Sequence, residues 1–405
     1  MAFRILADEN IPFVREAFGA FGEVRLVPGR CIRRDVLRAV DVLLVRSVTP
    51  VGAALLAGTP VRFVGTATIG TDHVDVDWLR REGIAFAHAP GSNAGSVVEY
   101  VLAALLRLAV RRGVALRGRT AGIVGCGHIG GRLVGRLRAL GMEVLVNDPP
   151  LAGALARGER PPACPLREGD LHFVPLDEVL ATADVLSLHV PLTRSGPYAT
   201  DHLIDAAALA RMKPGAWLVN TARGAVVDGA ALQEALRQGT VGAAVLDVWE
   251  GEPAPDPALI ARVDLGTPHI AGYSYDGKVA GTVMLYRAFT AHFGLAPAWD
   301  AGTALAPAPT DRLTLTPPDP ALDETAWLDA VVRQMYDIEA DDRRFRPLAT
   351  LPPPERAEHF SLLRKTYPRR RAFACHTLPA AVPGAYRTAL THGLGVRLPD
   401  EAEGP

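Results

Sequence analysis

The stretch TAGIVGCGHIGGRL, residues 120–133, decides the fold. An apolar run typical of a strand leads into Gly125-x-Gly127-x-x-Gly130, and a helical pattern follows at once. This placement predicts a dinucleotide-binding turn, in which Gly125 allows the tight turn, Gly127 lets backbone amides approach a pyrophosphate, and Gly130 lets the helix pack closely on the sheet. The positive end of the helix would then face the phosphates. The alternative is an ordinary glycine turn.

A carboxylate at the end of the next predicted strand indicates which dinucleotide binds. Asp148 closes the run EVLVND and lies 18 residues beyond Gly130. A carboxylate in this place bonds both ribose hydroxyls of adenosine and repels a 2′-phosphate. Two prolines follow Asp148, and not an arginine that would hold such a phosphate. The sequence therefore favours NAD over NADP. Arg157 and Arg160 in the next segment leave NADP as the alternative, since an arginine could hold its 2′-phosphate.

Around this turn the sequence alternates strand-like and helix-like segments for about 290 residues, which indicates an α/β fold with parallel sheets. Before the turn we predict buried strands at 3–8, 41–47, 61–67 and 84–90, and a long buried helix at 92–112 capped by Ser92 or Asn93. From the turn onwards we predict six strands of a doubly wound parallel sheet, at 120–125, 143–147, 184–189, 216–221, 243–248 and 263–266.

Three domains are expected. The first is a flavodoxin-like α/β substrate domain formed by residues 1–95 and 275–294, because a helix at 278–294 returns the chain to it. Residues 96–274 form the inserted NAD-binding Rossmann domain. Residues 295–405 form a C-terminal domain, which starts with a proline-rich linker and contains a helix at 325–345.

The composition excludes several classes of function. The 43 basic and 44 acidic side chains of the 405 residues nearly cancel, so no overall field draws the chain to nucleic acid or to an anionic membrane. The four cysteines form no C-x-x-C pair, the start of the chain has no signal-peptide pattern, and the most apolar helical run, at 101–110, is too short to cross a bilayer. We expect a cytoplasmic protein.

One basic segment runs against this balance. The segment RKTYPRRRAF, residues 364–373, has the composition of a nucleic-acid patch. We favour a charge run exposed to solvent or to a second subunit, and keep nucleic-acid binding as the alternative.

Three side chains suggest the chemistry. Arg223 in VNTARGAVVD, Glu252 in LDVWEGEP and His269 in TPHIAGYSYDGK each lie at or just past a predicted strand end, on one side of the nucleotide fold. The arginine fork suits a substrate carboxylate, and a carboxylate beside an imidazole favours its charged form. Such a pair serves an alcohol-to-ketone conversion beside a hydride acceptor. The alternatives are a surface ion pair for Arg223 and a core histidine for His269.

No metal site is predicted. The segment TDHVDVD, residues 71–77, is the only local candidate for metal ligands, and His73, Asp75 and Asp77 suit turn and cap positions better. We expect His189, at another strand end, to be structural.

The motifs GCGHIGGRL, NTARGAVVD, LDVWEGEP and TPHIAGYSYDGK resemble those of the D-isomer-specific 2-hydroxyacid dehydrogenases. The resemblance implies that Arg223 orients the substrate, that His269 is the acid/base and that Glu252 is its partner. It also implies that Ser47, Thr68 and Tyr273 contact the substrate. It assigns contacts with NAD to Gly125, Gly127, His128, Ile129, Gly130, Asp148, Thr221, Ala222, Arg223, Asp247 and Gly272.

Further segments, LADENIP, VRSVT, FVGTATIGTDHVD and NDPP, narrow the resemblance to members that oxidise 4-phospho-D-erythronate in pyridoxine biosynthesis. These members have an α/β dimerisation domain at the C-terminus, so a homodimer is implied. Two rivals stay open: an enzyme of the 3-phosphoglycerate or hydroxypyruvate type, and a non-catalytic protein that senses NAD. The chain departs from the family at Val190, where a threonine is common, and in segment 151–172, which is longer than expected.

Overall fold

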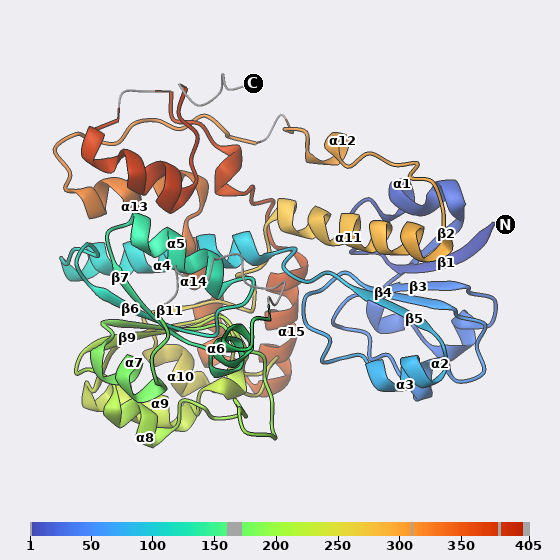
Figure 1. The fold of residues 1–405 in the computed structure, drawn as a ribbon, viewed down its shortest axis with the longest axis horizontal. Helices are drawn as coiled ribbons and strands as arrows, with labels where there is room; N and C mark the ends of the chain where they lie inside the picture. The colour runs from blue at the N-terminus through green and yellow to red at the C-terminus, as the bar shows by residue number, and fades with distance from the viewer. Residues whose placement is uncertain (1, 160–171, 309–310, 380–381, 400–405) are drawn as a thin grey trace. The chain divides into compact units, whose positions relative to one another are not determined.

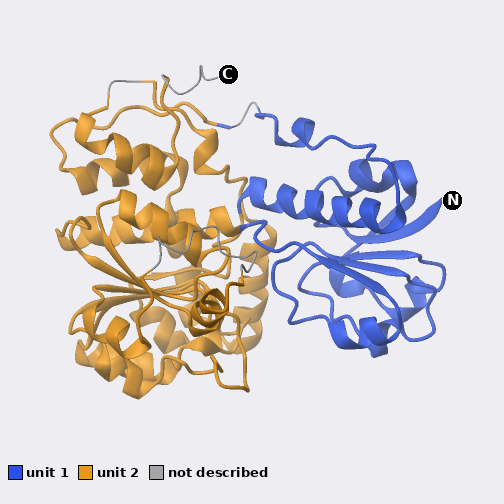
Figure 2. Cartoon of the chain, viewed as in Figure 1, with its two compact units in different colours: residues 1–93, 274–311 blue, residues 94–273, 312–405 orange. Residues whose placement is uncertain are grey.

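The computed structural model describes residues 2–159, 172–308, 311–379 and 382–399, and the chain divides into two compact units (Figures 1 and 2). The first unit comprises residues 1–93 and 274–311, and the second comprises residues 94–273 and 312–405. The second unit therefore combines the predicted nucleotide domain with most of the C-terminal region. The predicted three-domain boundaries stay a prediction.

The first unit contains a parallel five-stranded sheet in the order β2-β1-β3-β4-β5, which is the flavodoxin-like order. The strands are β1 (Phe3–Asp8), β2 (Gly22–Val27), β3 (Val42–Val45), β4 (Phe63–Thr66) and β5 (Ala85–His88). The helices are α1 (Val14–Phe18), α2 (Ala53–Leu56), α3 (Val76–Arg81), α11 (Tyr275–Phe293) and α12 (Gly302–Leu305), with short 3-10 turns η1 (Gly19–Phe21), η2 (Gly29–Cys31) and η3 (Arg34–Leu37).

Side chains alternate across this sheet and form two cores. Ile5 and Leu44 pack with α1 and α11 on one face, whereas Leu6 and Leu43 pack with α2 and α3 on the other. Four of the strands were predicted, but β2 was not. Its residues alternate between half-buried and exposed at the edge of the sheet, so it lacks the continuous apolar run of a central strand.

The second unit contains a parallel six-stranded sheet in the order β11-β10-β9-β8-β6-β7. The strands are β6 (Thr120–Val124), β7 (Glu143–Asn147), β8 (Val185–Leu188), β9 (Ala216–Asn220), β10 (Val241–Leu246) and β11 (Leu265–Gly266). A single parallel bridge between Phe173 and Val146 adds a further position beyond β7. The strand order reverses between β6 and β8, which is the switch point where a doubly wound sheet binds its ligand.

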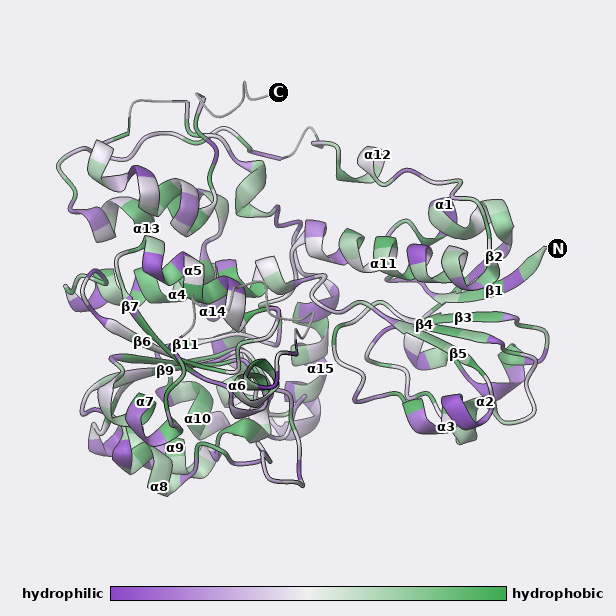
Figure 3. Ribbon diagram, viewed as in Figure 1, coloured by the Kyte–Doolittle hydropathy of each residue, from purple (hydrophilic) through white to green (hydrophobic). Residues whose placement is uncertain are grey.

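Helices cover both faces of this sheet (Figure 1). They are α4 (Ala94–Arg112), α5 (Gly130–Ala139), α6 (Pro149–Ala156), α7 (Leu176–Thr182), α8 (Ala206–Arg211), α9 (Gly229–Gln238) and α10 (Pro257–Arg262), with the 3-10 turn η5 (Gly224–Val226). The long buried helix α4 and α5 pack on one face, and α7 to α10 pack on the other. Figure 3 shows the strands between these layers in the hydrophobic colour.

The C-terminal part of the second unit wraps around the nucleotide fold. Its helices are α13 (Glu324–Met335), α14 (Ile338–Phe345) and α15 (Pro353–Lys365), with short turns η6 (Arg346–Thr350), η7 (Phe373–Cys375), η8 (Gly384–Tyr386) and the π-helix η9 (Ala389–Leu394). Trp327 and Phe373 join the core that contains α4, whereas Phe345 and Phe360 join the core on the opposite face.

The single helix predicted at 325–345 is wrong, because α13 and α14 are separate. Tyr336 is extended (φ −152°, ψ 109°) and ends α13. The carboxylate of Asp337 then accepts hydrogen bonds from the backbone N–H groups of Glu339 and Ala340 at 3.1 and 3.3 Å, which begins α14. The apolar period continues across the break, so hydrophobic pattern alone does not reveal it.

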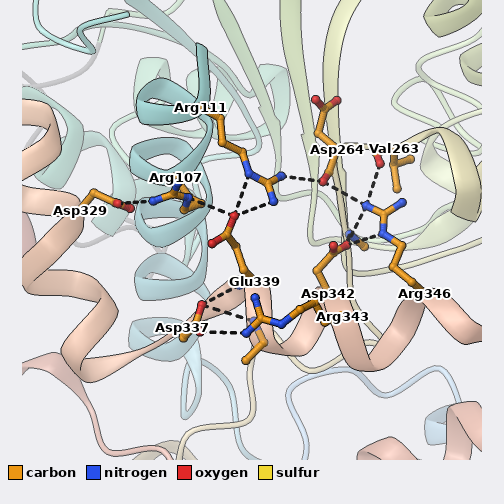
Figure 4. A network of polar contacts seen from close by, with 12 residues as sticks. Arg107, Arg111, Val263, Asp264, Asp329, Asp337, Glu339, Asp342, Arg343 and Arg346 are labelled. Carbon is orange, nitrogen blue, oxygen red and sulfur yellow. Dashed lines mark hydrogen bonds and ion pairs between the residues drawn. The ribbon is translucent and has the colours of Figure 1, made fainter. Parts of the chain in front are cut away.

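Buried ion pairs hold this C-terminal region to the nucleotide fold (Figure 4). Arg107 of α4 bonds Asp329 of α13 at 2.6 Å and lies 3.2 Å from Glu339 of α14. Arg346 donates to the backbone oxygens of Ile260 and Val263 at 2.7 and 2.8 Å.

No helix in the described residues has the length and apolar character that a membrane crossing requires.

Candidate active site

The glycine turn between β6 and α5 has the geometry that the sequence predicts. Gly125 has φ +89°, and a Cβ atom there would lie 2.7 Å from the backbone oxygen of His189. A Cβ atom on Gly130 would lie 2.0 Å from the backbone oxygen of Gly125, whereas one on Gly127 would meet nothing within 4 Å. The first and third glycines thus permit close packing, and the second leaves open space in front of the turn.

Asp148 is held beside this turn. Its Oδ2 accepts a hydrogen bond from the backbone N–H of Cys126 at 2.8 Å, and its Oδ1 accepts one from Leu151 at the start of α6 at 2.9 Å. A carboxylate offers about four acceptor positions, so capacity for ribose hydroxyls remains. Arg157 is engaged by Glu159 at 2.7 Å. Arg160 and most of segment 151–172 lie outside the described residues.

A second feature suits a dinucleotide. Thr221 follows β9 and is buried, and its Oγ1 has no hydrogen-bond partner among the residues that the structure describes. A buried hydroxyl without a partner is unfavourable, and a bound polar ligand would satisfy it. Together with the open space at Gly127 and the spare acceptors of Asp148, this fits NAD. The individual contacts predicted for His128, Ile129, Ala222 and Gly272 stay predictions.

Arg223 is positioned by close contact between two loops. A Cβ atom on the next residue, Gly224, would lie 2.0 Å from the carbonyl carbon of Trp249, so the loops after β9 and β10 touch through their backbones. The Asn220 side chain donates to the backbone oxygen of Arg223 at 2.9 Å. The Arg223 guanidinium donates to the backbone oxygen of Ala222 at 2.8 Å. Only glycine at 224 allows this approach, which brings Arg223 to the loop that carries Glu252.

His269 and Glu252 form the predicted pair. Nδ1 of His269 lies 2.8 Å from Oε2 of Glu252, while Oε1 accepts a hydrogen bond from the Trp249 backbone N–H at 2.8 Å. Burial opposes the charged form of Glu252, but the charge and hydrogen bond of His269 outweigh it and lower the pKa of Glu252. No hydrogen bond to Nε2 of His269 is seen within the described ranges. Glu252 therefore fixes the ring and leaves Nε2 for a substrate.

Asp247 organises the loop that carries this histidine. Its buried carboxylate accepts hydrogen bonds from Thr267 Oγ1 at 2.6 Å and from the backbone N–H groups of Ile270 and Ala271 at 2.7 and 2.9 Å. Burial raises its pKa, although the His269 charge and these bonds act in the opposite direction. A positioning role thus emerges that the sequence did not reveal. The predicted contact of Asp247 with NAD stays a prediction.

The C-terminal region also reaches this loop. Arg370 donates to the backbone oxygen of Ala271 at 2.9 Å, and the Tyr367 ring meets the Tyr273 ring edge-on at 5.8 Å between centroids. We predicted that the charged side chains of residues 364–373 are exposed. This prediction is wrong for Arg370 and Arg371, which are only 5% and 6% exposed. Their burial also counts against the nucleic-acid alternative. About 100 residues separate these contacts in the chain, so no local pattern predicts them.

The other predicted residues have varied surroundings. Ser47 is exposed just after β3, and the Thr68 hydroxyl bonds Thr66 at 2.8 Å and donates to Gly70 at 3.0 Å. Both belong to the first unit, and their substrate contacts stay predictions. Asp75 caps α3, as predicted, by accepting from Trp78 at 2.9 Å. Within the described ranges, no group of three His, Cys, Asp or Glu side chains is placed to hold a metal ion.

His189 is half-buried just after β8, its Nδ1 has no hydrogen-bond partner among the described residues, and its structural role stays a prediction. Its Nε2 lies 2.9 Å from the Ser187 hydroxyl, and burial lowers the pKa of His189 to about 3. The ring is thus neutral at physiological pH. Val190, the departure from the family pattern, packs against the core beneath β8 and β9, and its Cγ1 would lie 2.9 Å from a Cβ atom on Gly125.

Comparison with known proteins shows the family. Residues 104–271 match the family described as "D-isomer specific 2-hydroxyacid dehydrogenase, NAD binding domain", and residues 308–391 match a "Domain of unknown function (DUF3410)". An erythronate-4-phosphate dehydrogenase from Salinibacter ruber is 59% identical over 98% of this chain and 99% of its own length. The chain belongs to the D-isomer-specific 2-hydroxyacid dehydrogenase family.

Further members agree. Erythronate-4-phosphate dehydrogenases from Azotobacter vinelandii and Salmonella arizonae are 52% and 48% identical, over 91% and 97% of this chain and 92% and 97% of their own. A D-lactate dehydrogenase from Aquifex aeolicus, solved with NAD and lactic acid, has a TM-score of 0.58 at 26% identity, covering 72% of this chain and 96% of its own. As a member of this 2-hydroxyacid dehydrogenase family, the protein is an NAD-dependent oxidoreductase, and the predicted fold class and cofactor are confirmed.

Proposed function

We propose that the chain oxidises 4-phospho-D-erythronate at C2 to 3-hydroxy-4-phospho-2-oxobutanoate, with NAD as oxidant, in the biosynthesis of pyridoxal phosphate. The observation that carries the proposal is the 2.8 Å pair of His269 and Glu252 beside the Arg223 loop. The relatives named erythronate-4-phosphate dehydrogenase, which match nearly the whole chain at 47–59% identity, support this substrate over other 2-hydroxy acids.

Each side chain has a distinct part in the proposed reaction. Arg223 binds the substrate carboxylate through its planar fork and polarises the neighbouring carbon. Nε2 of His269 removes the proton of the C2 hydroxyl, and Glu252 stabilises the imidazolium that forms. NAD, when bound, would supply the two-electron acceptor for the hydride of C2, and the proton of the hydroxyl stays on His269 until solvent takes it.

Asp148, Thr221 and the Gly125–Gly130 turn would hold the cofactor. Asp247 holds the His269 loop in place through its three hydrogen bonds. We also propose that Ser47, Thr68 and Tyr273 contact the substrate. A homodimer formed through the C-terminal region is a further part of the proposal, and sedimentation equilibrium measures it: a monomeric mass at micromolar concentration would contradict it.

A panel of substrates tests the proposed function. The NADH absorbance band is followed with 4-phospho-D-erythronate, unphosphorylated D-erythronate, 3-phosphoglycerate and D-glycerate, each with NAD and NADP. We expect the highest kcat/KM with the first substrate and NAD. A higher kcat/KM with 3-phosphoglycerate would favour an enzyme of the 3-phosphoglycerate type, and a higher one with D-glycerate, which gives hydroxypyruvate, would favour the hydroxypyruvate type. NAD binding without turnover of any substrate would favour an NAD sensor.

A further inference from the structure

A positive side chain from the C-terminal region lies beside the catalytic pair. Arg364, in the last turn of α15, places its guanidinium carbon 5.6 Å from the centroid of the Tyr273 ring. Tyr273 closes the loop that carries His269 and is expected to contact the substrate. The charge of Arg364 also reaches Glu252 and contributes to the lowered pKa of that carboxyl. The α15 helix thus delivers a cation to the site from nearly 100 residues away in the chain.

This cation forms no ion pair at contact distance with a carboxylate in the part of the chain that the structure describes. Its Nε atom is buried and accepted by no hydrogen-bond partner there. A half-buried arginine ordinarily acquires a carboxylate, because burial of an unpaired charge is unfavourable. Among the described residues its guanidinium contacts the face of the Tyr273 ring, which attracts the charge weakly and leaves the N–H donors available. Such an arrangement suits an anionic ligand.

The neighbouring cation offers an instructive contrast. Arg344 lines a cavity of about 130 Å³ on the α14 side of α15, together with Pro268, Leu363 and Tyr367. The Asp341 carboxylate lies 3.5 Å from its guanidinium, so its charge is already neutralised within the protein. Arg344 is therefore already paired, whereas Arg364 forms no ion pair among the described residues and its charge is available to a substrate.

We propose that Arg364 is a specificity-determining residue that binds the phosphate group of the substrate. The inference rests on the proposed function, in which the substrate carries a carboxylate at one end and a phosphate at the other. Arg223 takes the carboxylate, so a second cation is needed for the phosphate, and an arginine fork matches its oxygens. The D-lactate dehydrogenase, solved with a substrate that has no phosphate, aligns with only 72% of this chain.

The first test compares Arg364→Gln with Arg344→Gln as the matched control. For Arg364→Gln we expect kcat/KM with 4-phospho-D-erythronate to fall by about 10- to 100-fold, the effect of losing a charged hydrogen bond, mainly through KM. The value with unphosphorylated D-erythronate should change by less than about threefold. Arg364→Lys keeps a charge without the fork and should retain part of the preference. The control should behave as the wild type with both substrates.

Equal losses of kcat/KM with both substrates would overturn the proposal, since Arg364 would then only position Tyr273 or Glu252. Unchanged kcat/KM with both substrates in Arg364→Gln would overturn it as well. Failure of the proposed function is visible separately, as absence of wild-type turnover of 4-phospho-D-erythronate. In that event calorimetry with inorganic phosphate and the NAD-saturated protein decides the matter. Phosphate affinity at least about tenfold weaker in Arg364→Gln than in Arg344→Gln supports a phosphate site, and equal affinity refutes it.

Discussion

At the scale of single residues, His269 combines an unusual backbone with a defined ring orientation. Its φ of +58° lies in the left-handed region, and its backbone N–H donates to the backbone oxygen of Asp247 at 2.7 Å. Asp247 also binds the two residues that follow His269. The loop is thus held on both sides of the histidine, and the ring is left with Glu252 as its hydrogen-bond partner. This is the arrangement that a general base needs.

The lowered pKa of Glu252 predicts a pH-dependent contribution to stability. Because its folded pKa lies below that of an unfolded glutamate, about 4.3, the carboxylate stabilises the fold above that value. This contribution is lost as the pH falls through the folded pKa. The difference in unfolding free energy between the wild type and Glu252→Gln, from urea titrations, should therefore shrink between about pH 5 and pH 3. A constant difference over this range would contradict the pair.

The His269–Glu252 pair and the nearby Arg223 loop could be proposed from the sequence because each residue lies at or just past a predicted strand end with a motif around it, and their catalytic roles stay a proposal. The supporting residues could not be proposed in this way. Asp247 was predicted to contact NAD, and its hydrogen bonds to the His269 loop depend on how β10 and β11 lie side by side. Arg370 and Arg364 come from a segment whose composition predicts an exposed charge run. Side chains that act through long-range packing carry no local sequence signal.

At the scale of elements, we predict different effects of alanine substitution at two glycines of the turn between β6 and α5, Gly127 and Gly130. Gly127→Ala should leave stability nearly unchanged, because nothing lies within 4 Å of the new methyl group, but it should weaken NAD binding about tenfold by occupying the space in front of the turn. Gly130→Ala should destabilise the fold by about 1–3 kcal/mol, because its methyl group would meet the Gly125 oxygen at 2.0 Å. Urea unfolding measures the effect on stability, and the change in protein tryptophan fluorescence on titration with NAD measures the effect on NAD binding. The reverse ranking would refute the assigned roles.

Elements with strong local patterns were predicted well. Central strands such as β6 and β9 are short apolar runs, and α4 is a long apolar helix, so burial and pattern agree. Two features were not predicted, strand β2 and the break between α13 and α14, and each has a physical cause. The edge strand β2 buries too little to need an apolar run, and the break between α13 and α14 depends on one extended residue and one capping aspartate.

At the scale of the whole molecule, ion pairs bind the C-terminal region to the nucleotide fold (Figure 4). Burial raises the pKa of Asp329, and Arg107 counteracts this by its charge and hydrogen bond. Arg107→Met would leave this carboxylate buried without its cation and should destabilise the protein by about 3–5 kcal/mol. Arg343→Met is the matched control, because the Arg343–Asp337 pair is largely exposed and should contribute less than about 1 kcal/mol. Urea unfolding compares them, and equal effects would contradict the distinction.

The sequence predicted two parallel sheets with helices, a discontinuous first part and a C-terminal α/β domain. It did not predict that the C-terminal region belongs to the same compact unit as the nucleotide fold. That arrangement depends on buried contacts such as Trp327 against the α4 core and Arg346 against the residues before β11, which only the folded chain brings together. It explains how a distant segment comes to contact the loop that carries His269.

The central claim is that His269 transfers the substrate proton, and one kinetic measurement tests it most directly. The variant His269→Asn removes the imidazole while keeping a residue that tolerates the positive φ, so the loop is preserved. With saturating NAD and 4-phospho-D-erythronate, we predict NAD binding as in the wild type and a rate of NADH formation lower by about 10²- to 10⁴-fold. NADH formation within about threefold of the wild-type rate would contradict the account.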